Sequence, residues 1–161
     1  MMVEFLPKEF DVPRVFEVEK FRLEVLRPEV AEIDYDAVMS SKRRLRQVFS
    51  SATEWPRDDM TLSENRDDLI RHQAEFESRE AFAYTVLTKD RARCIGCVYI
   101  DPCKLEKFDC EIYLWVREDC AELDDKLYEA IKAWVSGCWP FGSVIFPGRE
   151  VPWSKWESYQ K

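Results

Sequence analysis

The chain has 161 residues, which is the usual size of one domain and is long enough to bury a hydrophobic core without disulfides or a metal. It carries 24 basic and 32 acidic residues, for a formal net charge of −8, and 46% of its residues are hydrophobic. The acidic balance argues against binding to nucleic acid or to an anionic membrane, and the hydrophobic fraction excludes a disordered chain.

The first 20 residues combine prolines with apolar side chains. Pro7 and Pro13 discourage regular structure, whereas Val15, Phe16 and Val18 offer surface to bury. We therefore expect residues 1–20 to form an extended arm that packs on a single domain spanning residues 21–161.

The next part of the chain has the pattern of a strand followed by two helices. Strand-forming residues alternate over 21–26, and apolar residues recur at helical spacing over 28–49. After a loop, Thr61 and Glu64 have the spacing of a capping box, which predicts a second helix that ends near Ser78.

The second half has the pattern of three strands, a helix and a last strand. Short links, which favour antiparallel neighbours, join three strand-like runs at 82–87, 93–100 and 110–116. One face of the following helix, which ends at Gly137, collects Leu123, Leu127, Ile131, Trp134 and Val135. A short strand follows at 143–146, and the strand–helix–strand unit predicts a parallel crossover. The whole order is β-α-α-β-β-β-α-β, which predicts an α/β fold with a mixed sheet and a short, Trp-rich C-terminal tail.

The tail has three alternative roles. Trp153 and Trp156 could cover an edge of the sheet, fill a ligand site, or contact a second copy of the chain. The last of these would make a homodimer.

Several short sequences, together with this element order, resemble the GCN5-related N-acetyltransferase (GNAT) superfamily. They are Trp55-Pro56, 96–102 (GCVYIDP), 113–117 (YLWVR), 139–141 (WPF) and 147–149 (PGR). The resemblance implies the acyl-CoA N-acyltransferase-like fold. It also implies an enzyme that transfers an acetyl group from acetyl-CoA to a small amine.

In this superfamily, acetyl-CoA binds where the fourth strand of the sheet splays from the fifth. The pantetheine arm pairs with the fourth strand in the manner of an added strand, which by position involves Leu114, Trp115 and Val116. The pyrophosphate binds backbone N–H groups at the N-terminus of the following helix. The resemblance places in that loop Arg117, Cys120 and Leu123.

The same loop departs from the pattern of the superfamily. Asp119, Glu122 and Asp124 stand where relatives have Arg or Gln and then small residues, and no glycine lies between Cys97 and Gly137. Glycine lets a phosphate approach the backbone closely, whereas carboxylates repel it. These acids also suit the first turn of a helix, where they complement its dipole and can cap it. The alternative function is therefore a catalytically silent binding or dimerisation module that keeps the sheet without CoA.

Glu111 and Tyr159 are the candidate catalytic residues. Glu111 lies in phase with Tyr113 on the strand that would face the cleft, so it could deprotonate the amine; an outward-facing carboxylate is the alternative. Tyr159 is the only tyrosine after the last strand, and the resemblance gives such a tyrosine the role of protonating the thiolate. Asp58 and Asp59 could attract a cationic acceptor or lie in solvent as loop acids.

The six cysteines and the single histidine predict no metal site. Cys94 and Cys97 are three residues apart on a strand, where their side chains would face opposite sides, so they cannot chelate without a turn. Cys120 is expected to be an inert thiol because neighbouring carboxylates oppose its ionisation. His72 flanks the apolar stripe of its helix and is expected to be structural.

No stretch of the sequence has the roughly 20 apolar residues that span a membrane, and the N-terminus lacks the pattern of a signal peptide. We therefore expect a cytoplasmic protein with reduced thiols. Its expected partner is a small-molecule amine, rather than nucleic acid or a membrane.

Overall fold

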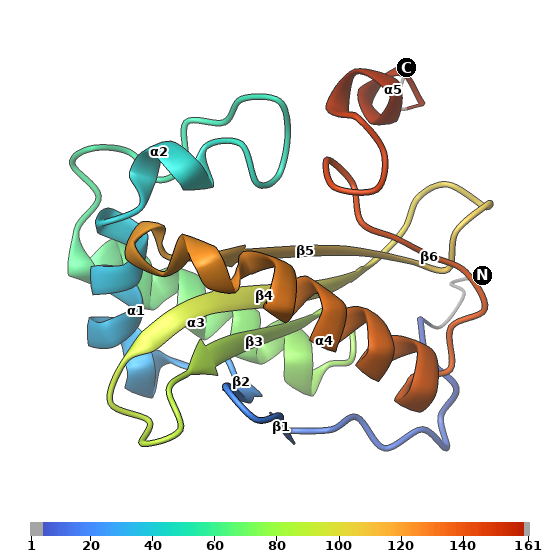
Figure 1. Ribbon diagram of the computed structural model, residues 1–161. Coiled ribbons are helices and arrows are strands. Elements are labelled where there is room, and N and C mark those ends of the chain that lie inside the picture. The colour runs from blue at the N-terminus through green and yellow to red at the C-terminus, as the bar shows by residue number, and fades with distance from the viewer. Residues whose placement is uncertain (1–4, 160–161) are drawn as a thin grey trace.

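A six-stranded mixed sheet in the order β1-β2-β3-β4-β5-β6 forms the centre of the molecule (Figure 1). The structure, a computed structural model, describes residues 5–159. Its strands are β1 Val15–Glu17, β2 Arg22–Val25, β3 Phe82–Leu87, β4 Cys94–Pro102, β5 Cys110–Val116 and β6 Val144–Ile145. Neighbours from β1 to β5 run antiparallel, and β6 runs parallel to β5. The predicted mixed sheet and parallel last strand are confirmed.

Helices cover both faces of this sheet. Figure 1 shows α4 in front of the sheet and α1 and α3 behind it, with α5 set apart above. The helices are α1 Ala31–Met39, α2 Lys42–Leu45, α3 Leu62–Glu77, α4 Asp124–Cys138 and α5 Trp153–Ser158, with 3₁₀ turns η1 Pro28–Val30 and η2 Glu118–Leu123. Between residues 5 and 159, none of the helices has the length and apolarity needed to cross a lipid bilayer.

The single helix predicted over 28–49 is wrong, because the chain breaks it into η1, α1 and α2. The break after α1 lies at Ser41, whose backbone is not helical and whose side chain is fully buried. Its hydroxyl accepts a hydrogen bond of 2.9 Å from the N–H of Glu118. The break therefore fastens the end of α1 to the loop after β5. By contrast, the predicted capping box of α3 is confirmed, since Thr61 and Glu64 exchange hydrogen bonds of 3.0 and 3.1 Å.

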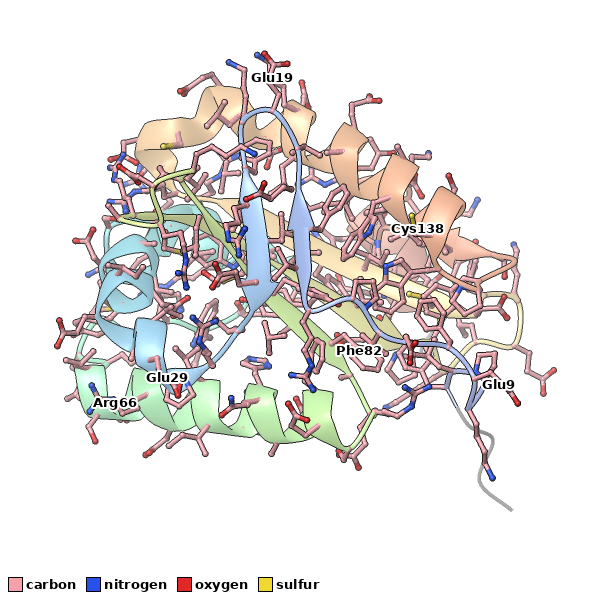
Figure 2. The ribbon with its side chains drawn as sticks, turned by 90° about the horizontal axis from the view of Figure 1, so that it is seen from below. Glu9, Glu19, Glu29, Arg66, Phe82 and Cys138 are labelled. Atoms are coloured by element: carbon pink, nitrogen blue, oxygen red, sulfur yellow. The ribbon has the colours of Figure 1, made fainter. Side chains whose placement is uncertain are left out.

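The α4 face of the sheet carries the larger aromatic core. Trp134 and its apolar neighbours on α4 pack against β3, β4 and β5, as their helical spacing predicts. The arm covers the same face: Phe5 stacks 5.9 Å from Phe82, and Tyr84 donates a 2.6 Å hydrogen bond to the carbonyl of Pro13. Figure 2 shows the β1–β2 hairpin between α3 and α4. The sequence did not predict β1, and residues 1–4 of the expected arm and 160–161 of the tail lie outside the described residues.

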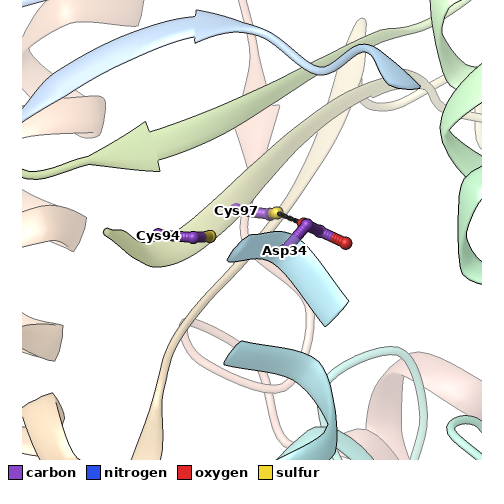
Figure 3. Close-up of side chains that lie close together, drawn as sticks. All are labelled: Asp34, Cys94 and Cys97. Carbon is purple, nitrogen blue, oxygen red and sulfur yellow. Dashed lines mark hydrogen bonds between the residues drawn. The ribbon is translucent and has the colours of Figure 1, made fainter. Parts of the chain in front are cut away.

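A β-bulge in β4 corrects the expectation for Cys94 and Cys97. Gly96 pairs with Val86 and Cys94 with Leu87, so one residue of β4 is skipped and the alternation of sides shifts. Both sulfurs consequently lie on the α1 face, beside Asp34 (Figure 3). Gly96 is required there, because a Cβ would lie 1.9 Å from the carbonyl oxygen of Trp115 on β5.

The last two strands separate soon after they meet. β6 pairs with β5 only at Cys110 and Glu111, and the β6-facing edge of β5 has no strand partner from Ile112 to Val116 in the described chain. Asp109 stabilises the start of the β5–β6 pairing, because its carboxylate accepts hydrogen bonds of 2.7 and 3.1 Å from the N–H groups of Gly142 and Ser143. A cleft therefore opens between β5 and the segment that follows β6.

Candidate active site

A cavity of about 700 Å³ lies on the α1 and α3 face of the sheet. Strands β4 and β5 form its floor, and its walls come from α1, α3 and the loop that follows α2. Arg71 is the one arginine that lines it, and no lysine does so in the described part of the chain. The carboxylic acids that line it are Asp34, Asp68, Glu75, Glu80, Asp101 and Glu111. Such an excess of acid concentrates cationic ligands.

Two of these acids face each other across neighbouring strands. Asp101 on β4 is directly opposite Glu111 on β5 in the sheet register. Burial raises the pKa of Glu111, although a hydrogen bond donated by the hydroxyl of Tyr113 opposes this effect. Burial, reinforced by the carboxylates of Glu111 and Glu75, raises the pKa of Asp101 to about 7. A carboxylate with a pKa near neutrality is suited to accept a proton from an amine.

Aromatic rings form the wall of the cavity beside this pair. The ring of Phe49 lies 5.1 Å from Tyr99, 5.4 Å from Tyr113 and 5.8 Å from Trp55. His72 also lines the cavity, with its ring 5.6 Å from Tyr99. Burial, helped by a nearby arginine, lowers the pKa of His72 to about 4, so the imidazole is neutral at neutral pH. The wall is therefore apolar, and the histidine adds no charge to it.

The inner end of the cavity reaches a buried polar cluster. Asp34 is 2% exposed and accepts hydrogen bonds from Asn65 at 2.9 Å and from the thiol of Cys97 at 3.4 Å. Ligand atoms of Asp34, Cys94 and Cys97 lie within 4.8 Å of one another, which is close enough to hold a metal ion. Burial raises the pKa of Cys97, which favours its thiol form. Cys94 is also a thiol and donates a hydrogen bond to the carbonyl of Gly96. The cluster is thus satisfied without an ion.

The cleft between β5 and the segment after β6 is smaller, at about 250 Å³. The indole of Trp153 lies in its wall, stacked on Tyr113 with ring centroids 6.4 Å apart and an angle of 8°. It donates a 3.2 Å hydrogen bond to the carbonyl of Gln47. Of the two tail tryptophans, Trp153 lines the cleft in which a ligand is expected, whereas Trp156 is buried beside Phe108.

The residues expected at pantetheine, Leu114, Trp115 and Val116, all lie on the unpaired edge of β5. Their side chains are buried in the cores on the two faces, so only their backbone is available to a ligand. The cleft lies beside Leu114 and Trp115. This edge therefore fits an extended ligand that pairs as an added strand.

The loop before α4 does not fit a phosphate in the same way. Arg117 is turned inward, with its side chain 5% exposed, and donates to the carbonyl of Cys94 and to Asp36 and Asp119. Cys120 is buried, and burial raises its pKa, as expected for an inert thiol. Asp119 binds arginines rather than capping a helix, and α4 begins only at Asp124, after Leu123. The acidic cap therefore does not form, whereas the expected acids in the first turn of the helix are present as Asp124 and Asp125.

Asp124 places a negative charge on the wall of the cleft. Its carboxylate accepts hydrogen bonds of 2.6 and 3.2 Å from Arg149 and lies 3.2 Å from Arg44. These two guanidiniums lower the pKa of Asp124 against the effect of burial. Both arginines also line the cleft, so an anion there would compete with Asp124 for them.

The remaining expected site residues lie outside both cavities. Tyr159 packs against Trp156 and lies under the ammonium of Lys107, at 5.9 Å from the ring centroid. Asp58 pairs with Arg46 at 2.9 Å. Asp59 lies 3.5 Å from Arg57. Of the catalytic candidates, Glu111 is the one that the structure places in a cavity.

The sheet order, the helices on both faces and the splayed last strands define the acyl-CoA N-acyltransferase-like fold of the GNAT superfamily. A ribosomal-protein-S5-alanine acetyltransferase from Vibrio fischeri matches it with a TM-score of 0.64 and 14% identity, over 92% of this chain and 81% of that one. The ribosomal L7/L12 α-N-protein acetyltransferase RimL, in complex with coenzyme A, matches with a TM-score of 0.59 and 13% identity, over 75% and 67% of the chains.

A third structure, the microcin C7 self-immunity acetyltransferase MccE in complex with acetyl-CoA and AMP, matches with a TM-score of 0.55 and 12% identity. The match covers 79% of this chain and 67% of that one. No family model matches the chain, and no curated protein matches it in sequence. The likeness at this level of identity is one of fold.

Proposed function

We propose that the protein is an acetyl-CoA-dependent N-acetyltransferase whose amine acceptor binds in the 700 Å³ cavity. The observation that carries this proposal is the position of the Asp101–Glu111 pair. Glu111 is the residue at which β5 makes its last pairing with β6, so the proton acceptors lie where the cleft begins. Tyr113 lines both the cavity and the cleft and joins the two. Similar structures with bound CoA or acetyl-CoA support the choice of donor.

The residues of the cavity prepare the amine for reaction. An ammonium group is attracted by the acidic lining, and Glu111 or Asp101 takes its proton, which exposes the nitrogen lone pair. Tyr113 holds the carboxylate of Glu111 in place by donating its hydroxyl hydrogen bond. Acetyl-CoA supplies a thioester carbonyl, and a C–N bond forms as the C–S bond breaks. The nitrogen loses its second proton to water, and the thiolate leaves with the electron pair and takes up a proton from water.

A second candidate function is a binding module without catalysis. Trp153 and Asp124 favour it, because they occupy the wall of the cleft with an indole and with a carboxylate that neutralises two arginines. In that case the acidic cavity would still bind a cation, and acetyl-CoA would not bind.

Thermal melts with acetyl-CoA and a thiol-release assay with a panel of amines separate the two functions. A ligand at 100 times its Kd stabilises the native state by about 2.7 kcal/mol, so the melting temperature should rise by several degrees. We expect Glu111→Gln to lower kcat by about 10²-fold. Glu106→Gln, which changes an exposed acid on the β4–β5 loop, should leave it unchanged. If acetyl-CoA gives no thermal shift and no amine gives thiol release, the transferase is rejected and the second candidate function, a binding module without catalysis, is supported.

A further inference from the structure

The carboxylates that line the acidic cavity lie at two places along β4. Cys97, Tyr99 and Asp101 follow one another on the same face of this strand, and the two outer residues are four positions apart, about 13 Å at the rise of a strand. The carboxylate of Asp34 lies against Cys97 at one end, at 3.4 Å. The Asp101–Glu111 pair marks the other end. The cavity therefore presents carboxylates at two places, and the distance between them is too long for a single ammonium group to contact both.

The carboxylates at the two ends outnumber the cations of the lining, because Arg71 is the one arginine or lysine that lines the cavity in the described part of the chain. Asp34 is held by an amide and a thiol, which are neutral donors, and no salt bridge reaches it in residues 5–159. Asp68 lies at the same end of the cavity and interacts electrostatically with Asp34. At the far end, Asp101 accepts no hydrogen bond from any described residue. Arg71 is shared between Asp68, at 3.9 Å, and Glu75, at 3.7 Å.

The middle of the cavity is apolar. The ring of Tyr99 lies between the two ends, with Phe49 against it and with Leu69 and Val38 among the other lining residues. Methylene groups bury favourably against such a surface, and an ammonium group near it gains from the faces of the rings. An alkyl chain therefore fits between the two carboxylate ends better than a second polar group would.

We propose that the acceptor is a linear aliphatic amine with two or more positive charges. The amine that reacts lies at Asp101 and Glu111, next to the cleft, and a second ammonium lies at Asp34 and Asp68, roughly 10 Å away along the cavity. This assignment rests on the proposed function, because it names the substrate class of the same site.

Calorimetric titration of the full chain with α,ω-diamines of increasing length, a linear triamine and the matching monoamines tests this assignment. We expect diamines or triamines with terminal nitrogens about 8–12 Å apart to bind at least tenfold more tightly than a monoamine of equal length. The same compounds should show the same order of kcat/KM in the thiol-release assay.

Asp68→Asn removes one charge at the inner end from a half-exposed helix position, so the fold should tolerate it. We expect it to reduce the ratio of diamine to monoamine affinity by about tenfold. Asp67→Asn is the matched control, because this neighbour on α3 is exposed and does not line the cavity. It should leave the ratio unchanged.

The outcomes distinguish this assignment from the function on which it rests. Equal affinity and equal transfer for monoamines and diamines, with no change of ratio in Asp68→Asn, would overturn the assignment and leave the transferase standing. Selective binding of diamines without thiol release would support the ligand class and reject the transferase. Absence of binding by every amine would overturn the assignment.

Discussion

Replacing Asp124 with asparagine tests whether the cleft between β5 and the segment after β6 receives a phosphorylated donor. Asp124 is the first residue of α4, and its side chain is 17% exposed. Its carboxylate now engages Arg149 and Arg44, the two arginines that line the cleft. Asp124→Asn keeps the size of the side chain and removes its charge, so both guanidiniums become free for another anion.

The magnitude follows from the distances. A phosphate oxygen that takes the place of one guanidinium contact would lie about 4 Å from the Asp124 carboxylate, which costs about 4 kcal/mol at an effective dielectric of 20. Salt and partial exposure reduce this repulsion, so we expect a gain in CoA affinity of roughly 10- to 100-fold in the variant. The same change removes two partly buried ion pairs and should lower the free energy of unfolding by about 1–2 kcal/mol.

The assay is calorimetric titration of wild type and variants with CoA at low salt. Asp125→Asn is the matched control, because Asp125 is the next residue of the same helical turn and is exposed. Arg149→Ala combined with Asp124→Asn should abolish most of the gain. If Asp124→Asn binds CoA no more tightly than Asp125→Asn does, the cleft does not receive the phosphates, and the argument from charge repulsion is refuted.

Three other predictions concern stability and access. Gly96→Ala should lower the free energy of unfolding, measured in urea, by about 3 kcal/mol, because its Cβ would meet a backbone oxygen at 1.9 Å. Gly137→Ala is the control: its Cβ would have nothing within 4 Å, and alanine favours a helix over glycine, so the free energy of unfolding should rise by up to about 1 kcal/mol. The pKa of Asp34 is about 6 in the folded protein against 3.8 in the unfolded chain, so the native state binds an extra proton and the free energy of unfolding should fall as the pH rises from about 4 to 6. Asp34→Asn should flatten this pH dependence in urea titrations, and an unchanged slope would contradict the raised pKa of Asp34. Trp153→Ala should open the cleft and strengthen CoA binding, and equal affinity would show that the indole is no obstacle.

The antiparallel run from β3 to β5 and the parallel return to β6 could be predicted because they depend on local patterns. Short runs of strand-forming residues between turns mark β3, β4 and β5, and a capping box marks the start of α3. A helix between the last two strands requires a parallel return, which the structure has. The position of Trp134 in the core followed from its helical phase.

The arrangement of the cavity could not be predicted, because it depends on register and on contacts between distant segments. Asp101 and Glu111 face each other only through the exact pairing of β4 with β5, which a single sequence does not specify. Asp34 meets Cys97 across 63 positions of the chain. The bulge before Cys97 puts Cys94 and Cys97 on the same side of β4, whereas strict alternation would put them on opposite sides. A lone glycine within a strand pattern is the signal that could have indicated the bulge.

The buried side chain of Arg117 braces the loop between β5 and α4, the two elements that form one wall of the cleft. It ties the loop before α4 to β4 and to α1, while the N–H of Glu118 is held by Ser41. The opposite wall ends in α5, which stands clear of the sheet and is anchored in the cleft by Trp153 (Figure 1). Any widening of the cleft would therefore have to separate Trp153 from Tyr113 and break the ion pairs of Arg149 with Asp124 and of Lys132 with Glu150.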